Sequence, residues 1–163
     1  MVLESLKRAK KASTILAQMS TAQKNSLLLK MASELELSTA DILAANAKDI
    51  SAALASNVKE SLRDRLTLNE SRLKSIANDM RYVASLPDPV GEEKGWSMPN
   101  GLNIRKVRVP LGVVGVIYES RPNVTVDVAA LCIKSGNAAV LRGSSSALNS
   151  NRAIVKALAK ALP

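Results

Sequence analysis

The sequence predicts an α/β fold in which a layer of helices precedes the start of an open parallel, Rossmann-like sheet. Up to about residue 86, apolar residues recur three and four positions apart, which is the helical period. Proline and glycine then interrupt the chain, and after residue 110 two Val- and Ile-rich runs alternate with helical patterns, the order of a right-handed crossover unit. We therefore divide residues 1–163 into a helical layer (1–86), a hairpin (91–109) and the first half of a parallel sheet (110–163).

The first 86 residues are expected to form four main helices and a shorter one near Val58 to Arg65. Two helix starts have the spacing of a capping box, in which a hydroxyl and a side chain three residues later bind each other's backbone N–H groups. These pairs are Ser20 with Gln23 and Thr67 with Glu70. The apolar faces of the first two helices contain Leu3, Leu6 and Ala9, then Leu27, Leu28, Met31 and Leu35.

The hairpin follows from a turn signal and an alternating strand. Asn100-Gly101 is a dipeptide that favours tight hairpin turns. Leu102 to Val109 alternates apolar with mostly basic residues, as a half-exposed strand does, and Pro110 ends it.

The parallel unit begins with Leu111 to Tyr118, whose nearly continuous Val, Ile and Gly predict a strand buried on both faces. Pro122 to Ile133 is expected to form a helix ended by Gly136, Asn137 to Leu141 a second buried strand, and Ala147 to Leu162 an amphipathic helix. Doubly wound sheets normally have about five or six strands, so the sheet is expected to be incomplete in this chain.

The amino-acid composition limits the kinds of catalytic and binding site that this chain can form. The absence of His removes imidazole bases and every His-containing zinc site, and no metal site is expected. The single cysteine, Cys132, lies among apolar residues in the middle of a predicted helix, so it is interpreted as a small buried hydrophobe and not as a nucleophile. No run of residues predicts a membrane span or a signal peptide. The net charge of +9 is concentrated after residue 96, yet only 2% of the residues are aromatic, which disfavours nucleic-acid binding.

The first candidate site follows the first buried strand. Ser120 and Arg121 precede Pro122, which favours the start of a helix, and the free N–H groups there suit a phosphate or an oxyanion. The amide of Asn123 adds a neutral donor. The simpler alternative is that Asn123 caps the helix and that Arg121 is a solvated side chain.

The second candidate site follows the second buried strand, where Arg142 is followed by Gly143, Ser144 and Ser145. Backbone amides, hydroxyls and a cation at this position can hold a ribose or a phosphate. The segment lacks both the P-loop ending and a Gly-x-Gly-x-x-Gly fingerprint, so an ordinary strand-to-helix turn stays open as an alternative.

Longer stretches carry a family resemblance. Val107 to Asp127, together with Lys134 to Ala138 and Leu141 to Gly143, closely resembles the gamma-glutamyl phosphate reductase family, the proline-biosynthesis branch of the aldehyde dehydrogenase superfamily. The likeness extends upstream through Leu43 to Asp49 and Asp64 to Leu66, and so covers essentially the whole chain.

The resemblance implies NADPH-dependent reduction of gamma-glutamyl phosphate to glutamate 5-semialdehyde, with attack by a cysteine thiolate and release of phosphate. Asn123 matches the oxyanion-hole asparagine of the superfamily. Arg142 aligns with the position that contacts the adenine ribose of NADP(H), and Gly143, Ser144 and Ser145 follow on the ribose-facing loop.

The same resemblance implies a small-molecule substrate contacted by Ser120 and Arg121, a hairpin used for homo-oligomerisation, and a cytoplasmic enzyme. The chain departs from the family pattern at Ser144-Ser145-Ser146, where a second Gly and a nearby acidic residue are common. Family members are much longer, and their catalytic cysteine lies beyond the position of Pro163. We therefore expect a fragment that is inactive by itself. The alternative is a non-catalytic interaction module that pairs with a longer subunit, which would cover its apolar strands.

Overall fold

The computed structural model describes residues 2–162, and its first half is helical. The helices are α1 (Val2–Gln18), α2 (Thr21–Leu37), α3 (Thr39–Ala55), α4 (Glu60–Leu66) and α5 (Glu70–Ser85). The expectation of four main helices and one short helix before residue 87 is confirmed.

One of the two predicted capping boxes is present. At the start of α2, the Gln23 N–H donates to Ser20 Oγ (3.3 Å) and the Ser20 N–H donates to Gln23 Oε1 (2.8 Å). The prediction of a capping box at Thr67 is wrong, because α5 is capped by Asn69, whose Oδ1 accepts the Arg72 N–H at 2.7 Å. The Thr67 hydroxyl donates to a carbonyl of α4 instead, so Thr67 ends that helix.

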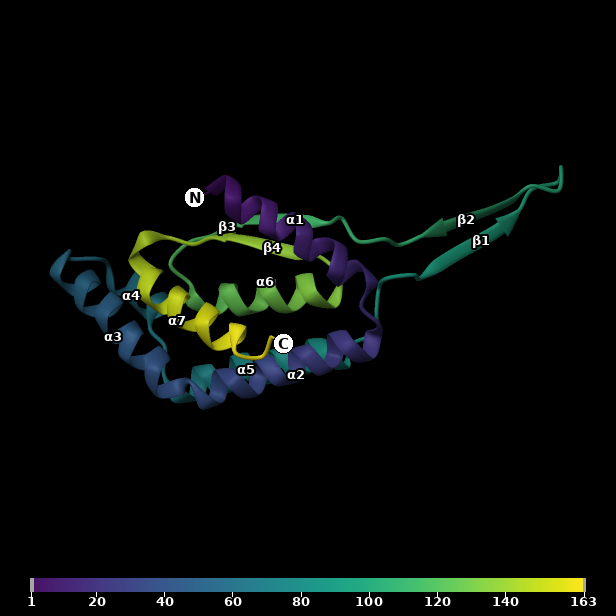
Figure 1. Ribbon diagram of the computed structural model, residues 1–163. Helices are drawn as coiled ribbons and strands as arrows, with labels where there is room; N and C mark the ends of the chain where they lie inside the picture. Colours follow the sequence, from purple (N-terminus) through teal and green to yellow (C-terminus); the bar gives the residue numbers. More distant parts are fainter. Residues whose placement is uncertain (1, 163) are drawn as a thin grey trace.

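The predicted hairpin consists of β1 (Glu93–Ser97) and β2 (Asn103–Val107), which pair antiparallel with Trp96 opposite Ile104. Gly101 has a φ of 83°, a left-handed conformation that glycine adopts without strain and that closes the turn. Figure 1 shows the hairpin extending away from the body of the molecule, and every residue of β1 is exposed.

The parallel unit consists of β3 (Val113–Ile117), α6 (Pro122–Lys134), β4 (Ala138–Arg142), the single turn η1 (Ser145–Ala147) and α7 (Leu148–Ala159). β3 and β4 pair in parallel, with Val113 opposite Ala138. Helix α1 lies on one face of this pair and α6 on the other (Figure 1). The predicted order of strand, helix, strand and helix is confirmed.

The prediction that both strands are buried on both faces is wrong. No residue of β3 is fully buried; Ile117 at its end is 87% exposed, and Leu111 before it is 86% exposed. In β4 only Ala138 is buried. The physical reason is that a two-stranded sheet gives each strand a free edge, and a single helix on each face cannot cover both strands.

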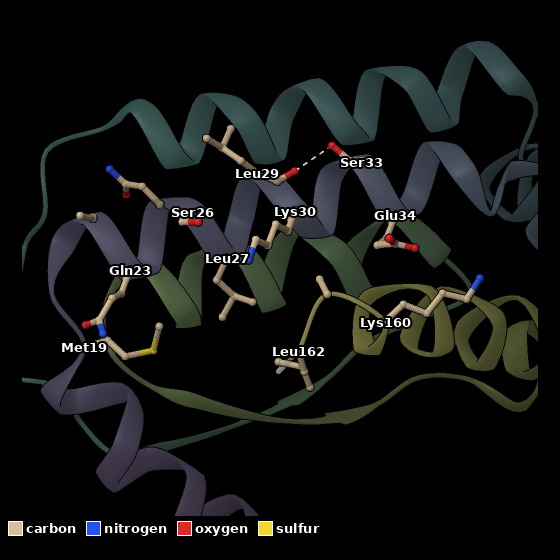
Figure 2. A pocket seen from close by; sticks show the side chains of 13 residues that line it. Met19, Gln23, Ser26, Leu27, Leu29, Lys30, Ser33, Glu34, Lys160 and Leu162 are labelled. Carbon is tan, nitrogen blue, oxygen red and sulfur yellow. Dashed lines mark hydrogen bonds between the residues drawn. The ribbon is translucent and has the colours of Figure 1, made fainter.

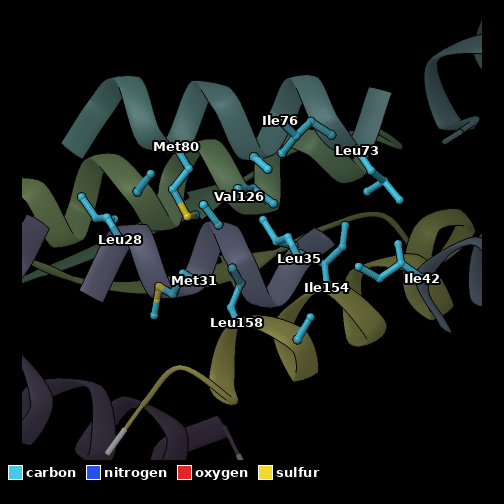
Figure 3. Packing of buried hydrophobic residues seen from close by; sticks show 14 of the residues in the cluster. Leu28, Met31, Leu35, Ile42, Leu73, Ile76, Met80, Val126, Ile154 and Leu158 are labelled. Atoms are coloured by element: carbon cyan, nitrogen blue, oxygen red, sulfur yellow. The ribbon is translucent and has the colours of Figure 1, made fainter. Parts of the chain in front are cut away.

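The main core lies between two pairs of helices and not against the sheet. It is formed by side chains of α2 and α5 packed on those of α6 and α7, with one contribution from α3 (Figure 3). Its members include Leu28, Met31, Leu35, Ile42, Leu73, Ile76, Met80, Val126, Ile154 and Leu158. Because α6 follows β3 and α7 follows β4 after the single turn η1, this core helps determine where the loops at the strand ends lie.

Candidate active site

Two loops meet at the carboxyl ends of β3 and β4. The hydroxyls of Ser120, after β3, and Ser146, in η1, lie 2.5 Å apart, and Ser146 also bonds the Ser144 hydroxyl at 2.8 Å. The candidate residues of both loops are therefore neighbours, at the sheet edge where ligands bind in open α/β folds. Ser146 was not among the predicted site residues, although it directly follows two of them.

Asn123 lies in the first turn of α6. Its Nδ2 donates to Asp127 Oδ2 at 3.1 Å, one helical turn further on, which leaves its second amide N–H for another acceptor. The alternative that Asn123 caps the helix is wrong, because the cap position is Arg121 and no side chain bonds there. Partial burial raises the pKa of Asp127, despite the bond from Asn123, and the nearby charge of Asp79 acts in the same direction.

Asn123 and Arg121 line a groove of about 320 Å³. The rest of this groove comes from the end of α4, the start of α5 and the connection between them, and includes two further guanidinium groups. These residues are Asp64, Arg65, Thr67, Leu68, Arg72, Ser75, Ile76 and Asp79. The predicted oxyanion donor therefore faces a polar groove rather than bulk solvent alone.

A second groove of about 450 Å³ adjoins the serine loops. It is lined by Leu62, Arg65, Glu119, Ser120, Arg121 and Ser144. Arg65 and Arg121 occur in both grooves, so they stand between the Asn123 side and the serine side. The sequence predicted Arg121 as a site residue but not Arg65. The only sequence feature that pointed to Arg65 was its place in Asp64 to Leu66, a segment that resembles the family.

Side chains pack closely around Gly143 in the loop after β4. A Cβ at Gly143 would lie 2.4 Å from Asn151 Nδ2 and 3.1 Å from the Tyr118 ring, so any other residue would require the Asn151 side chain to move. Ser144 has a φ of −64°, which any residue adopts, so serine in place of the family's second glycine causes no backbone strain here. The exposed Arg142 donates to the Gly143 carbonyl at 2.9 Å. Ser145 is exposed beside them.

These residues could hold a ribose or a phosphate of a nicotinamide cofactor. The loop offers a cation, hydroxyls and a backbone without a side chain at Gly143, and residues 142–146 include no acidic group. A 2′-phosphate on the ribose would therefore meet no repelling charge from this loop.

The interpretation of Cys132 is confirmed. Its side chain is buried on α6, and burial raises the pKa of the thiol, which disfavours the nucleophilic thiolate.

A cavity larger than either groove lies elsewhere. About 1090 Å³ of space is bounded by α2 and by residues 160–162 after α7 (Figure 2). Leu27, Lys30 and Leu162 are among its lining residues. Because α7 runs back from the strand ends over twelve residues, this cavity is at the opposite end of α7 from the serine loop.

The fold and the two grooves define an open α/β protein with candidate ligand sites at the carboxyl ends of its parallel strands. Residues 2–163 match the model of the aldehyde dehydrogenase family, so the chain belongs to that family. Its members are oxidoreductases that use a nicotinamide cofactor. Across residues 2–162, no helix has the length and apolar character needed to cross a membrane.

The chain is similar to proteins named gamma-glutamyl phosphate reductase. It is 52% identical over 160 residues to that of Clostridium kluyveri, covering 98% of this chain and 38% of the relative. It is 56% identical over 162 residues to that of Carboxydothermus hydrogenoformans, covering 99% and 39%. The chain thus spans less than half the length of these relatives.

Solved structures of proteins with the same name are also similar to this chain. The crystal structure of gamma-glutamyl phosphate reductase from Thermotoga maritima matches with a TM-score of 0.93 and 46% identity, over 98% of this chain and 39% of that one. The Saccharomyces cerevisiae structure of the same name matches with a TM-score of 0.90 and 35% identity, over 96% and 40%. The predicted fold, the N-terminal part of an aldehyde dehydrogenase fold, is confirmed.

Proposed function

We propose that this chain supplies the oxyanion donor and part of the cofactor and substrate sites of an NADPH-dependent gamma-glutamyl phosphate reductase. The observation that carries the proposal is the Asn123 amide, which lies in a polar groove at a helix start in a chain 52–56% identical to proteins of that name. The reaction converts an acyl phosphate into an aldehyde and releases phosphate, a step of proline biosynthesis in the cytoplasm.

Asn123 acts on the reacting carbonyl. Negative charge develops on the carbonyl oxygen when a nucleophile adds, and the free N–H of Asn123 donates to that oxygen. Asp127 accepts the other N–H and so holds the amide with its nitrogen toward the groove. Ser120 and Arg121 contact the substrate from the loop that precedes α6.

Arg142, Gly143, Ser144 and Ser145 hold the adenine ribose and its phosphate. NADPH, when bound, supplies the hydride that reduces the carbonyl carbon. The nucleophile is not Cys132, because its thiol is buried, and the chain has no other cysteine. We therefore expect no turnover from the isolated chain. We also place homo-oligomerisation of the complete enzyme on the exposed β1–β2 hairpin.

A chimera tests this function. Residues 1–163 replace the matching 39% of the Carboxydothermus hydrogenoformans relative, and phosphate-dependent reduction of NADP⁺ by glutamate 5-semialdehyde is measured. We expect turnover by the chimera and none by the isolated chain. Asn123→Ala is expected to lower kcat by about 10²- to 10³-fold.

The matched control is Asn78→Ala, an exposed asparagine on α5 whose loss is expected to leave kcat unchanged. A folded chimera without turnover, beside an active relative, would refute the proposed reaction. Equal rates for the Asn123 and Asn78 variants would refute the role of Asn123 alone.

A further inference from the structure

Two arginines from distant parts of the sequence form one wall of the candidate site. Arg65 is near the end of α4, and Arg121 is in the loop between β3 and α6. Both line the groove that contains Asn123, and both line the groove that contains Ser120 and Ser144. Two guanidinium groups therefore face the space where the proposed reaction takes place.

The third arginine of the groove is already neutralised. Arg72 Nη2 donates to Asp64 Oδ1 at 2.8 Å, and its Nη1 donates to the carbonyl oxygens of Asp64 and Thr67 at 2.6 and 2.7 Å. Arg72 thus ties α4 to α5 and uses the charge of Asp64. It has a structural role.

Arg65 and Arg121 lack the close hydrogen bonds that Arg72 makes. Arg65 Nη1 is 3.7 Å from Glu119 Oε2, and these side chains are 50% and 77% exposed, so the pair is weak. Within residues 2–162, the Arg121 side chain has no hydrogen bond or ion pair. Asp79 adds a carboxylate to the first groove and Glu119 adds one to the second, so the lining side chains leave each groove with a net charge of +1, which favours an anionic ligand.

We propose that Arg65 acts with Arg121 to bind an anionic oxygen group of the substrate, and that this group displaces Glu119 from Arg65. The planar guanidinium binds a phosphate or a carboxylate through two parallel hydrogen bonds, which an ammonium cannot do. This inference rests on the proposed function and adds Arg65 as a substrate-binding residue.

The substrate has two such groups. In gamma-glutamyl phosphate, the phosphate is attached to the reacting carbonyl and the α-carboxylate is at the other end. Because the carbonyl donor Asn123 and the two arginines line the same groove, both groups are candidate ligands of the arginines. A guanidinium binds the phosphate and the α-carboxylate through the same kind of hydrogen bonds, and KM measurements on the chimera distinguish the two groups.

Binding to the chain itself is the first test. The ¹⁵N-labelled chain is titrated with inorganic phosphate and, separately, with L-glutamate, while the backbone amide signals of residues 119–121, 123 and 124 are followed. We expect saturable shifts with at least one probe. Arg65→Gln and Arg121→Gln should each weaken binding by at least about tenfold, the effect of losing a hydrogen bond to a charged group.

Arg105→Gln is the matched control. Arg105 has the same weak contact, 3.7 Å to Glu93, but lies in the hairpin. A spectrum of unchanged dispersion shows that each variant is folded. Absence of saturable shifts with both probes would overturn the inference, as would equal affinities for the Arg65 and Arg105 variants.

The chimera identifies the group that is bound. If Arg65→Gln raises KM for phosphate alone, the two arginines bind the phosphate; if it raises KM for glutamate 5-semialdehyde alone, they bind the carboxylate. A change in KM for NADP⁺ alone would overturn the inference in favour of a cofactor contact. Arg65→Lys, which keeps the charge but not the planar fork, should restore only part of the affinity. A parent chimera without turnover would refute the proposed function, whereas phosphate binding by the chain is measured independently.

Discussion

Asp88 and Lys24 form a buried ion pair that joins the start of α2 to the segment after α5. Lys24 Nζ lies 2.7 and 2.5 Å from the two carboxylate oxygens, and its side chain is 2% exposed. The carboxylate also accepts the Thr21 hydroxyl at 2.7 Å and the Val90 N–H at 3.0 Å. Burial opposes the charged form, but these hydrogen bonds outweigh it and hold the pKa of Asp88 below its usual range.

The pH dependence of stability follows from this pair. Because the pKa of Asp88 is lower in the folded state, its contribution is complete above the usual pKa of an aspartate and is lost as the pH falls through the folded pKa. Asp88→Asn should lower the free energy of unfolding at neutral pH by about 3 kcal/mol, since Lys24 stays buried without its counter-charge. Urea unfolding between about pH 7 and 3 measures this, and the loss on acidification should be smaller in the variant.

Glu60→Gln is the control for Asp88→Asn, because Glu60 is exposed in the first turn of α4. Its expected effect is within about 0.5 kcal/mol. An Asp88 variant with the same acid sensitivity as the unmodified chain would contradict the assignment.

At the scale of elements, α3 positions the start of α7. Asp49 Oδ2 accepts the Ser150 N–H at 2.8 Å and the Ser150 hydroxyl at 2.6 Å, and Oδ1 accepts Asn149 Nδ2 at 2.8 Å. Asn46, one turn earlier, donates to the Leu66 carbonyl and to Ser150 Oγ. An acidic group at a helix start also interacts favourably with the helix dipole. The loop of Arg142 to Ser146 leads into this junction.

Removal of the Asp49 carboxylate tests the junction. Asp49→Ala should lower the free energy of unfolding by about 3 kcal/mol, because the buried donors of Ser150 and the exposed donors of Asn149 lose their acceptor. Urea unfolding gives the stability, and hydrogen exchange of these two amides should accelerate. Asp41→Ala, an exposed acid on the same helix, is the control and should change stability by less than about 1 kcal/mol. Comparable losses in both variants would place the stabilisation elsewhere.

At the scale of the whole molecule, large apolar side chains remain exposed to solvent in β3 and just before it. Leu111 and Ile117 are 86% and 87% exposed, and β3 pairs with β4 alone. Exposed apolar strands with free edges favour association. This observation is what favours the interaction-module alternative.

Sedimentation velocity over a range of concentrations tests the open strand. We expect the chain to self-associate, and Ile117→Lys to shift it toward monomer while the urea midpoint stays unchanged, since the replaced side chain is already in solvent. Glu60→Lys on α4 is a comparable exposed change outside the hairpin and should leave β3-mediated association in place. A monomeric unmodified chain at the highest concentration would count against the interaction-module alternative.

The sequence by itself determined the order of the elements, the start of α6 before Asn123 and the burial of Cys132, because periodicity, proline and turn residues act over a few positions. It failed at Thr67, where a nearby Asn competed for the same cap, and at β3, where burial depends on what covers the strand. Only the tertiary structure decided that Arg65 lies in the same grooves as Arg121 and that Ser146 contacts Ser120. The parallel pairing of β3 with β4 brings Ser120 beside Ser146, and the packing of α5 on α6 brings the segment of Arg65 beside that of Arg121.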